Sequence, residues 1–503
     1  MDVAANNNPG PSRASPFRER DIAFDPVVIG FFRGYLRMIN NTHNQSIRAA
    51  MTRASAGAAF ALLAMAMILP TNGWGQQSAP LLPVSVAKDG FDAEESYHYR
   101  SIFSHDKVLN RDEGFRVADE NVYYNLHWDD VMPVNVVRRS GPIRELPYAP
   151  DDRIGQVRAS TRLGELSLDE VMVDERSRIQ GFMVVHEGVI VYEAYPGMRL
   201  NDNHIWYSTS KTVPSLLLSI LEAQGKVDVN DPIDEYMTET RGTHWEGIRI
   251  IDILDMASGL DLEETQETML SEDHKVNQFF RTSLGASIPR DDPADSSPLT
   301  VDEIIYSIDD DETIPPGTIF QYSSLNTRML AMLVERISGR RFAELLSDYV
   351  WSMIGAEADA FIGLNPSGGA EIGGMMNSRL RDLARYGLLF TQDASSVFGE
   401  EMLERWQLSA PFSPGDVIST GCRPEIHQRA LERENFFGAL NPNIRCNSRQ
   451  WDYVYDDGDI FKGGVGGQGL YVSPSRNLVV AFYSTTLGSW ESYARAIAMQ
   501  MDQ

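Results

Sequence analysis

A serine stands three residues before a lysine in Trp206-Tyr207-Ser208-Thr209-Ser210-Lys211-Thr212-Val213-Pro214-Ser215, and an apolar helical pattern follows. Positions i and i+3 of a helix share a face, so a turn entering this helix points Ser208 and Lys211 at the same place. A serine with a basic lysine beside it is a candidate nucleophile for acyl transfer. The same spacing occurs in Ser104-His105-Asp106-Lys107, but no sustained helical pattern follows that copy, and we discard it.

The composition describes a globular protein with an acidic surface. The chain has 503 residues, of which 43% are hydrophobic, and its formal net charge is −27. This length and composition leave room for a large core. A surface of this charge repels phosphate backbones, so we exclude nucleic acid as a partner.

The N-terminal region predicts export. A short basic start at Met51-Thr52-Arg53 precedes an unbroken apolar run over residues 56–69, and small residues follow as far as Gly75. This is the layout of a secretory signal peptide, and the run is short for a membrane span of about 20 residues. We expect translation to start at Met51 or Met38 and the mature protein to be periplasmic or secreted. The alternative is an uncleaved N-terminal anchor, the one case in which we expect contact with a membrane.

The two cysteines of the chain are Cys422 and Cys446. One interpretation is a pair of buried thiols, and the other is a disulfide that closes a polar segment. Because disulfides persist in oxidising compartments, export favours the disulfide.

The chain divides into a leader (1–75), an N-terminal extension (76–165) and a main domain (166–503) with an insertion at 411–455. Two strands joined by a tight turn are expected at 181–193, and two more strands at 462–472 and 478–483. Helical patterns lie between these strands, whereas residues 261–300 read as an irregular acidic loop. A sheet assembled from distant segments predicts an α+β fold.

Acyl transfer at Ser208 requires a base, a proton donor and stabilisation of an oxyanion. Lys211 is a base only where burial or neighbouring charge destabilises its ammonium. Tyr322 follows a Pro-Pro-Gly turn and could pass the proton onward, since a cationic lysine lowers the pKa of a neighbouring tyrosine. Its alternative interpretation is a core tyrosine.

The glycine-rich stretch 463–469 also has two interpretations. It is a kinked strand, or a strand whose backbone approaches a substrate closely enough for its N–H groups to bind the carbonyl oxygen. The N–H of Ser208 at a helix N-terminus would be a second donor. Ser324, Gly464 and Gln468 are the candidate substrate contacts.

Metal and cofactor sites have no support in the sequence. Nine histidines are present, and no pair has the spacing of a zinc-binding helix. Phosphate-binding and dinucleotide-binding loops are also missing from the sequence, so we predict neither a metal nor an organic cofactor.

Three motifs together resemble those of the serine β-lactamase and penicillin-binding-protein superfamily: Ser208-Thr209-Ser210-Lys211, Tyr322-Ser323-Ser324 and Lys462-Gly463-Gly464. Three further segments are similar to motifs of the same family: Leu254-Asp255-Met256-Ala257-Ser258-Gly259-Leu260, Pro316-Gly317-Thr318-Ile319-Phe320-Gln321-Tyr322-Ser323 and Arg381-Asp382-Leu383-Ala384-Arg385-Tyr386-Gly387. The likeness is co-linear over roughly 175–500. It implies a β-lactamase/transpeptidase-like fold, with a central antiparallel sheet flanked by helices and a mainly helical subdomain.

The resemblance also implies roles. Ser208 would be the acylated nucleophile, Lys211 its general base and Tyr322 the group that protonates the leaving group. The backbone N–H groups of Ser208 and Val465 would form the oxyanion hole.

Two departures shape the predicted substrate. Ser324 stands where class C β-lactamases have asparagine, and Gly463 stands where lactamases have threonine or serine. The chain looks closer to the 6-aminohexanoate-dimer hydrolases and their esterase relatives, which implies a small-molecule amide or ester as substrate. The alternatives are a β-lactamase or D-amino-acid peptidase, or a catalytically silent binding protein of the same fold. The sequence leaves the oligomeric state open.

Overall fold

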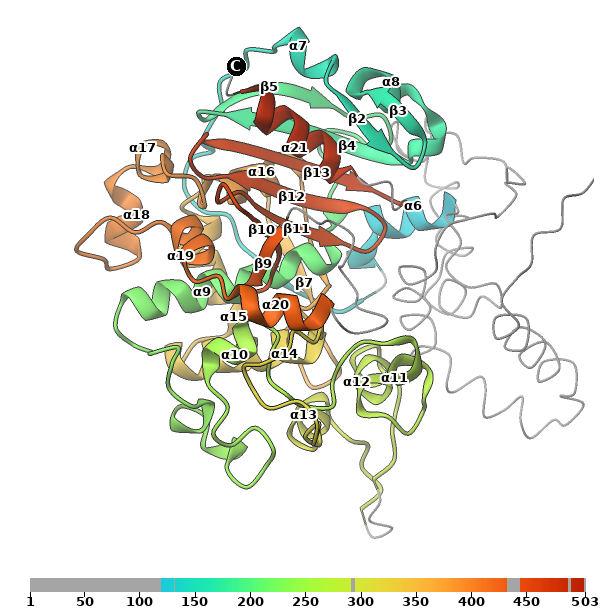
Figure 1. Ribbon diagram of the computed structural model, residues 1–503, viewed down its shortest axis with the longest axis vertical. Coiled ribbons are helices and arrows are strands. Elements are labelled where there is room, and N and C mark those ends of the chain that lie inside the picture. Colours follow the sequence, from blue (N-terminus) through green and yellow to red (C-terminus); the bar gives the residue numbers. More distant parts are fainter. Residues whose placement is uncertain (1–118, 131, 291–294, 432–443, 487–489, 502–503) are drawn as a thin grey trace, which may run out of the picture. The chain divides into compact units, whose positions relative to one another are not determined.

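The computed structural model describes residues 119–501, apart from residue 131 and residues 291–294, 432–443 and 487–489 (Figure 1).

Several expectations lie outside these residues. They are the leader with its apolar run, the cleavage after Gly75 and the discarded Ser104-His105-Asp106-Lys107 copy. Among the helices described, none is long and apolar enough to cross a membrane.

A seven-stranded sheet forms the centre of the described chain, and every neighbouring pair of its strands is antiparallel. Its strands in spatial order are β5 (Val189–Ala194), β4 (Ile179–His186), β13 (Leu478–Ser484), β12 (Gln468–Ser473), β11 (Ile460–Gly464), β10 (Trp451–Tyr455) and β9 (Ile444–Ser448). β4 and β5 come from the start of the main domain, whereas the other five come from its last sixty residues or so. The predicted α+β fold with a central antiparallel sheet is confirmed.

Alternating side chains of this sheet supply two separate cores, as the period of two in a strand requires. On β13, Val479, Ala481 and Tyr483 belong to one cluster, and Leu478, Val480 and Phe482 belong to the other. The second cluster is covered by α7 (Asp152–Gly155), α8 (Leu168–Val173) and α21 (Glu491–Gln500). The first is covered by α16 (Leu380–Leu388), which lies on the opposite face of the sheet (Figure 1).

Most of the remaining helices form the predicted helical region, which packs on the α16 side of the sheet (Figure 1). The remaining helices are α9 (Thr212–Ala223), α10 (Ile250–Leu254), α11 (Gln266–Leu270), α12 (Lys275–Ser283), α13 (Val301–Tyr306), α14 (Ser324–Ser338), α15 (Phe342–Leu346), α17 (Ala394–Phe398), α18 (Glu400–Arg405), α19 (Pro414–Thr420) and α20 (Pro424–Leu431).

The extension contributes to the fold from α6 (Asp119–Leu126) onward. A four-stranded sheet has the order β1 (Val134–Val137), β7 (Ala360–Gly363), β8 (Met376–Ser378) and β6 (His204–Ile205). A separate hairpin joins β2 (Arg158–Thr161) to β3 (Gly164–Ser167). β6 runs directly into the Ser208 segment, so this second sheet fixes where that segment begins.

Residues 261–300 contain helices, and the expectation of an irregular acidic loop is wrong. α11 begins at a Thr265 cap, and α12 buries Val276, Phe279 and Phe280 on one face. Spacing of three and four residues between apolar side chains is the helical signal. The prediction missed this helical signal because acidic and polar residues surround it.

The 411–455 insertion is also more ordered than a polar loop. It contains α19 and α20, and its end forms β9 and β10, which extend the main sheet beyond β11. Trp451 and Val454 of β10 are buried, although the sequence around them is mostly polar. The insertion therefore completes the sheet on the side of the glycine-rich strand.

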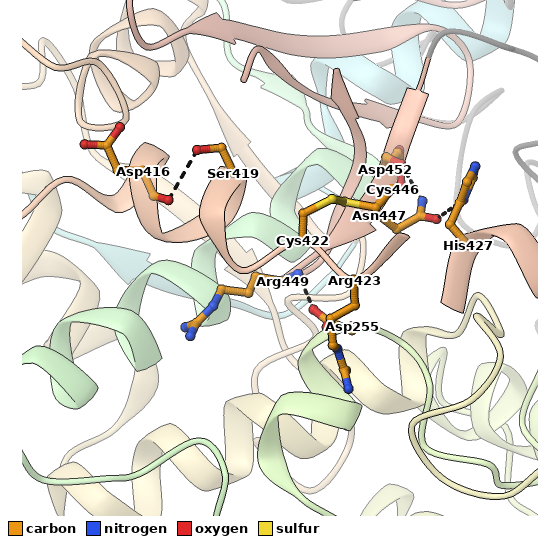
Figure 2. Close-up of a disulfide and its surroundings, with 10 residues drawn as sticks. All are labelled: Asp255, Asp416, Ser419, Cys422, Arg423, His427, Cys446, Asn447, Arg449 and Asp452. Carbon is orange, nitrogen blue, oxygen red and sulfur yellow. Dashed lines mark hydrogen bonds and ion pairs between the residues drawn. A yellow bond between two sulfur atoms is a disulfide. The ribbon is translucent and has the colours of Figure 1, made fainter. Parts of the chain in front are cut away.

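The structure joins Cys422 to Cys446 in a disulfide across this insertion (Figure 2). Cys422 follows α19, and Cys446 lies on β9, 24 residues later in the sequence. A cross-link over a loop of this length removes conformational freedom from the unfolded chain worth about 3 kcal/mol. It ties the first half of the insertion to the strand that ends it.

Candidate active site

Ser208 and Lys211 lie in η3 (Tyr207–Lys211), a 3₁₀ helix that leads into α9. Side chains at i and i+3 eclipse one another in a 3₁₀ helix, so this geometry brings the two closer than an α-helix would. The Lys211 Nζ donates to the Ser208 Oγ across 3.2 Å. Both side chains are buried.

The backbone before Ser208 is in an unusual conformation. Tyr207 has a φ of 46°, in the left-handed region that costs an ordinary residue roughly 1 kcal/mol or more. Its hydroxyl donates to the Asn125 Oδ1 of α6 at 2.8 Å. Three residues after Tyr207, the Ser210 Oγ donates to the carbonyl of Ile372 at 2.6 Å. These contacts hold the turn that presents Ser208.

Burial lowers the pKa of Lys211 to about 7. The carboxylate of Glu264 opposes this effect, the Lys462 ammonium adds to it, and Asp452 opposes it again. The ammonium also donates to the carbonyl of Gly373. A large share of Lys211 is therefore uncharged near neutral pH, which is the form that accepts a proton.

Tyr322 completes the group of three predicted catalytic residues. It lies in the segment that enters α14, where Ser323 is the N-cap, and it is hydrogen-bonded to Ser208. The Nζ atoms of Lys211 and Lys462 lie 5.3 Å and 4.9 Å from the centre of its ring.

The prediction that a neighbouring lysine lowers the pKa of Tyr322 is wrong. Burial raises the pKa of Tyr322 well above its usual value, and the charges of Asp452 and Glu264 raise it further. The sequence pattern showed the nearby lysines and not the depth of the side chain. Tyr322 therefore remains protonated at neutral pH and is a hydrogen-bond donor.

The glycine-rich strand lies directly against the nucleophile. A Cβ added at Gly464 would lie 2.5 Å from the carbonyl oxygen of Trp206 and 3.2 Å from the Ser208 nitrogen. Val465 follows in the hairpin turn between β11 and β12, and the Thr209 hydroxyl reaches the Lys462 carbonyl at 3.5 Å. The structure thus brings both predicted oxyanion-hole positions to one place.

The other candidate substrate contacts divide into two cases. Ser324 is the first residue of α14, and its side chain lies beside Gly373, which also contacts Lys211. Gln468 is buried and donates from Nε2 to the Ser484 carbonyl at 2.6 Å. The described contacts of the Gln468 side chain thus run to β13 and not to Ser208.

Glu264 and Asp452 are site residues that sequence reasoning missed. The backbone N–H of Glu264 donates to the Tyr322 carbonyl at 2.9 Å, and its carboxylate accepts from the backbone N–H of Ser324. Asp452 forms an ion pair with Lys462. Of the residues in these contacts, Lys462 was identified from the sequence by its motif. Glu264 and Asp452 were missed because both lie in segments that we predicted to be exposed and polar.

Metal ligation finds no support in the part of the chain that the structure describes. No group of three or more histidine, cysteine or acidic side chains there is arranged to hold a metal ion.

Two known proteins resemble this chain over most of its length. A 6-aminohexanoate-dimer hydrolase from Paenarthrobacter ureafaciens is 28% identical over 383 residues, which cover 75% of this chain and 88% of that protein. A solved structure from Bacillus anthracis, assigned to the 6-aminohexanoate-dimer hydrolases, has a TM-score of 0.58 and 21% identity. It covers 77% of this chain and 94% of that chain, and at this identity it shows the fold alone.

The sequence profile of the Beta-lactamase family matches residues 170–500. This range is more than half of the chain, and it contains Ser208, Lys211, Tyr322 and Lys462. The resemblance predicted from the motifs is confirmed. The chain therefore belongs to the Beta-lactamase family of hydrolases.

Proposed function

We propose that this protein is a serine hydrolase that cleaves small amides or esters through an acyl-enzyme, with 6-aminohexanoate oligomers and carboxylic esters as its substrate classes. One observation carries the proposal. The Ser208 hydroxyl is hydrogen-bonded both to a buried lysine whose pKa is about 7 and to a protonated tyrosine. A nucleophile, a base and a proton donor are the minimum set for acyl transfer.

In the acylation step, uncharged Lys211 takes the proton of Ser208 as its Oγ bonds to the substrate carbonyl carbon. The carbonyl oxygen gains negative charge and accepts hydrogen bonds from the N–H groups of Ser208 and Val465. Tyr322 gives its proton to the leaving amine or alkoxide, and Lys211 returns a proton to Tyr322. Water then attacks the acyl-enzyme, and the same groups carry its proton to Ser208.

Apolar side chains on two sides of the site support a substrate with an aliphatic acyl group. One cluster contains Tyr207 and has Val465 packed against it, together with Tyr124, Trp128, Met132, Ile205, Leu284 and Met375. The other surrounds Tyr322 with Met256, Ala257, Phe320, Ile426 and Ala430. The Paenarthrobacter relative carries the name of an enzyme for 6-aminohexanoate dimer, a linear aliphatic amide.

The rival activities fit the site less well. A β-lactamase or D-amino-acid peptidase would use an asparagine and a hydroxyl residue where this chain has Ser324 and Gly463. A silent binding protein has no need of a buried lysine, and burying the ammonium of a lysine costs several kcal/mol.

We also propose that the protein is exported. The disulfide between Cys422 and Cys446 supports this, since such bonds persist in oxidising compartments. N-terminal sequencing of the protein recovered from its native host is expected to start at Gln76. A chain that starts near Met1 and stays with the membrane fraction contradicts the signal peptide and supports an anchor.

Substitution of the nucleophile tests the function itself. Ser208→Ala is expected to lower kcat/KM by about 10⁴-fold or more, because the acyl-enzyme cannot form. The assay compares 6-aminohexanoate dimer, p-nitrophenyl butyrate and a chromogenic cephalosporin. Unchanged hydrolysis of all three by Ser208→Ala would refute the proposal, and preference for the cephalosporin would favour a β-lactamase.

The pKa of Lys211 predicts the acidic side of the pH profile. Protonated Lys211 cannot accept the Ser208 proton, so kcat/KM for p-nitrophenyl butyrate should rise with pH and level off above about 7. Glu264→Gln removes a carboxylate that raises the pKa of Lys211, and this variant should move the rise to lower pH. Identical pH profiles for the unaltered protein and for Glu264→Gln would exclude Lys211 as the base.

The close approach of β11 predicts a contrast between adjacent glycines. Gly464→Ala places a methyl group against the Trp206 carbonyl, so the strand must move away from Ser208, and kcat should fall by about 10² to 10³-fold. At Gly463 the nearest atoms to an added Cβ are Phe461 ring carbons at 3.4 Å, an ordinary contact, and Gly463→Ala is the matched control. Equal loss in both variants would argue against an oxyanion hole at this strand.

A further inference from the structure

The 411–455 insertion reaches the active site through one carboxylate. Asp452 lies on β10, beside β11, and its Oδ1 is 2.5 Å from the Lys462 Nζ. Its Oδ2 accepts the backbone N–H of Gly463 at 3.0 Å. The two oxygens therefore hold both the side chain of Lys462 and the strand that carries it.

Lys462 needs this partner because of where it lies. Its side chain is fully buried, whereas Asp452 keeps 23% of its side chain exposed. A buried ammonium without a counter-charge is strongly unfavourable. Burial lowers the pKa of Lys462, and the carboxylate of Asp452 opposes this more strongly than that of Glu264 does.

The Lys462 ammonium in turn acts on the catalytic groups. It lies 4.9 Å from the centre of the Tyr322 ring, and its charge helps lower the pKa of Lys211. The charged groups that face it are Asp452 from β10, Glu264 from the segment after α10 and Lys211 from η3. Its charge therefore influences the base, and its ammonium lies against the ring of the proton donor.

A chain of contacts fixes Asp452 in place (Figure 2). The Asn447 side chain donates to the Asp452 backbone carbonyl, and the Asn447 Oδ1 lies 2.6 Å from the His427 Nδ1 of α20. The neighbouring Cys446 is disulfide-bonded to Cys422. Next to Cys422, the Arg423 Nε donates to Asp255 at 2.7 Å, which ties the insertion to the residue after α10.

We propose that Asp452 is a positioning residue that keeps the Lys462 ammonium charged and in contact with Tyr322, so that the insertion is part of the catalytic machinery. This inference rests on the proposed hydrolase function. Asp452 holds Lys462 and does not itself touch the reacting atoms.

Charge and shape at this position can be separated by substitution. Asp452→Asn keeps the shape and removes the charge, and Asp452→Glu keeps the charge. Loss of the opposite charge lowers the pKa of Lys462 further. Since the active form that we propose has Lys462 protonated, the alkaline side of the kcat/KM profile of Asp452→Asn should move to lower pH by about one pH unit or more.

The experiment measures p-nitrophenyl butyrate hydrolysis against pH for the full-length protein and its variants. Asp452→Asn is expected to lose about 10 to 100-fold in kcat/KM, and Asp452→Glu to restore the alkaline side of the profile. Adding Asp452→Asn to Lys462→Met should cost much less than Asp452→Asn costs alone, because most of its effect passes through Lys462. Asp457→Asn is the control, a carboxylate after β10 whose ion pairs run to Arg476 and Arg495.

The experiment distinguishes failure of the inference about Asp452 from failure of the proposed hydrolase function. If Ser208 is essential but the alkaline side of the profile is the same in Asp452→Asn and Asp457→Asn, Asp452 has only a structural role and the inference is wrong. If Ser208→Ala hydrolyses the ester as fast as the unaltered protein, the hydrolase proposal fails, and the inference fails with it.

Discussion

Two buried ammonium groups beside one serine are the constraint on which the site depends. Taking a lysine out of water costs several kcal/mol, and two of them repel each other at short range. The fold meets this cost with carboxylates from separate segments, Glu264 before α11 and Asp452 on β10. The two lysines therefore have different roles. Lys211 has a pKa of about 7 and can act as a base, while Lys462 is ion-paired with an acid.

The segments that surround Ser208 come from nearly the whole described chain. Asn125 of the extension holds Tyr207, Gly373 binds Lys211, and the glycine-rich strand lies against the Ser208 nitrogen. In the reaction that we propose, Asn125 and Gly373 have no chemistry of their own, and the strand contributes only a backbone N–H to the oxyanion hole. These segments fix the orientation of the reacting groups, which is the greater part of what preorganised catalysis requires.

The sequence predicted the elements with local patterns and missed those that depend on tertiary contacts. Ser208 and Lys211 share a face in any helix, so the 3₁₀ geometry did not matter to that prediction. Tyr322 and the Lys462 strand were identified because three motifs in order are specific. Asp452 and Glu264 look like surface acids in the sequence, and only the register of β10 on β11 or the path of a loop brings them to the site. The direction of the Tyr322 pKa shift was wrongly predicted for the same reason, because the burial of a side chain cannot be read from the residues next to it in the sequence.

The position of β13 has a consequence for the order in which the site comes into being. This strand, from residues 478–484, lies between β4 and β12, so it separates the strand pair that precedes Ser208 from the strand that faces it. A chain still emerging from the ribosome already contains the serine and both lysines, yet it lacks the strand that brings them together. Long-range antiparallel pairing of this kind forms late, after its loops have closed. In the enzyme that we propose, the strand pair before Ser208 and the strand that carries Lys462 therefore join one sheet only after β13 has paired with β4 and β12.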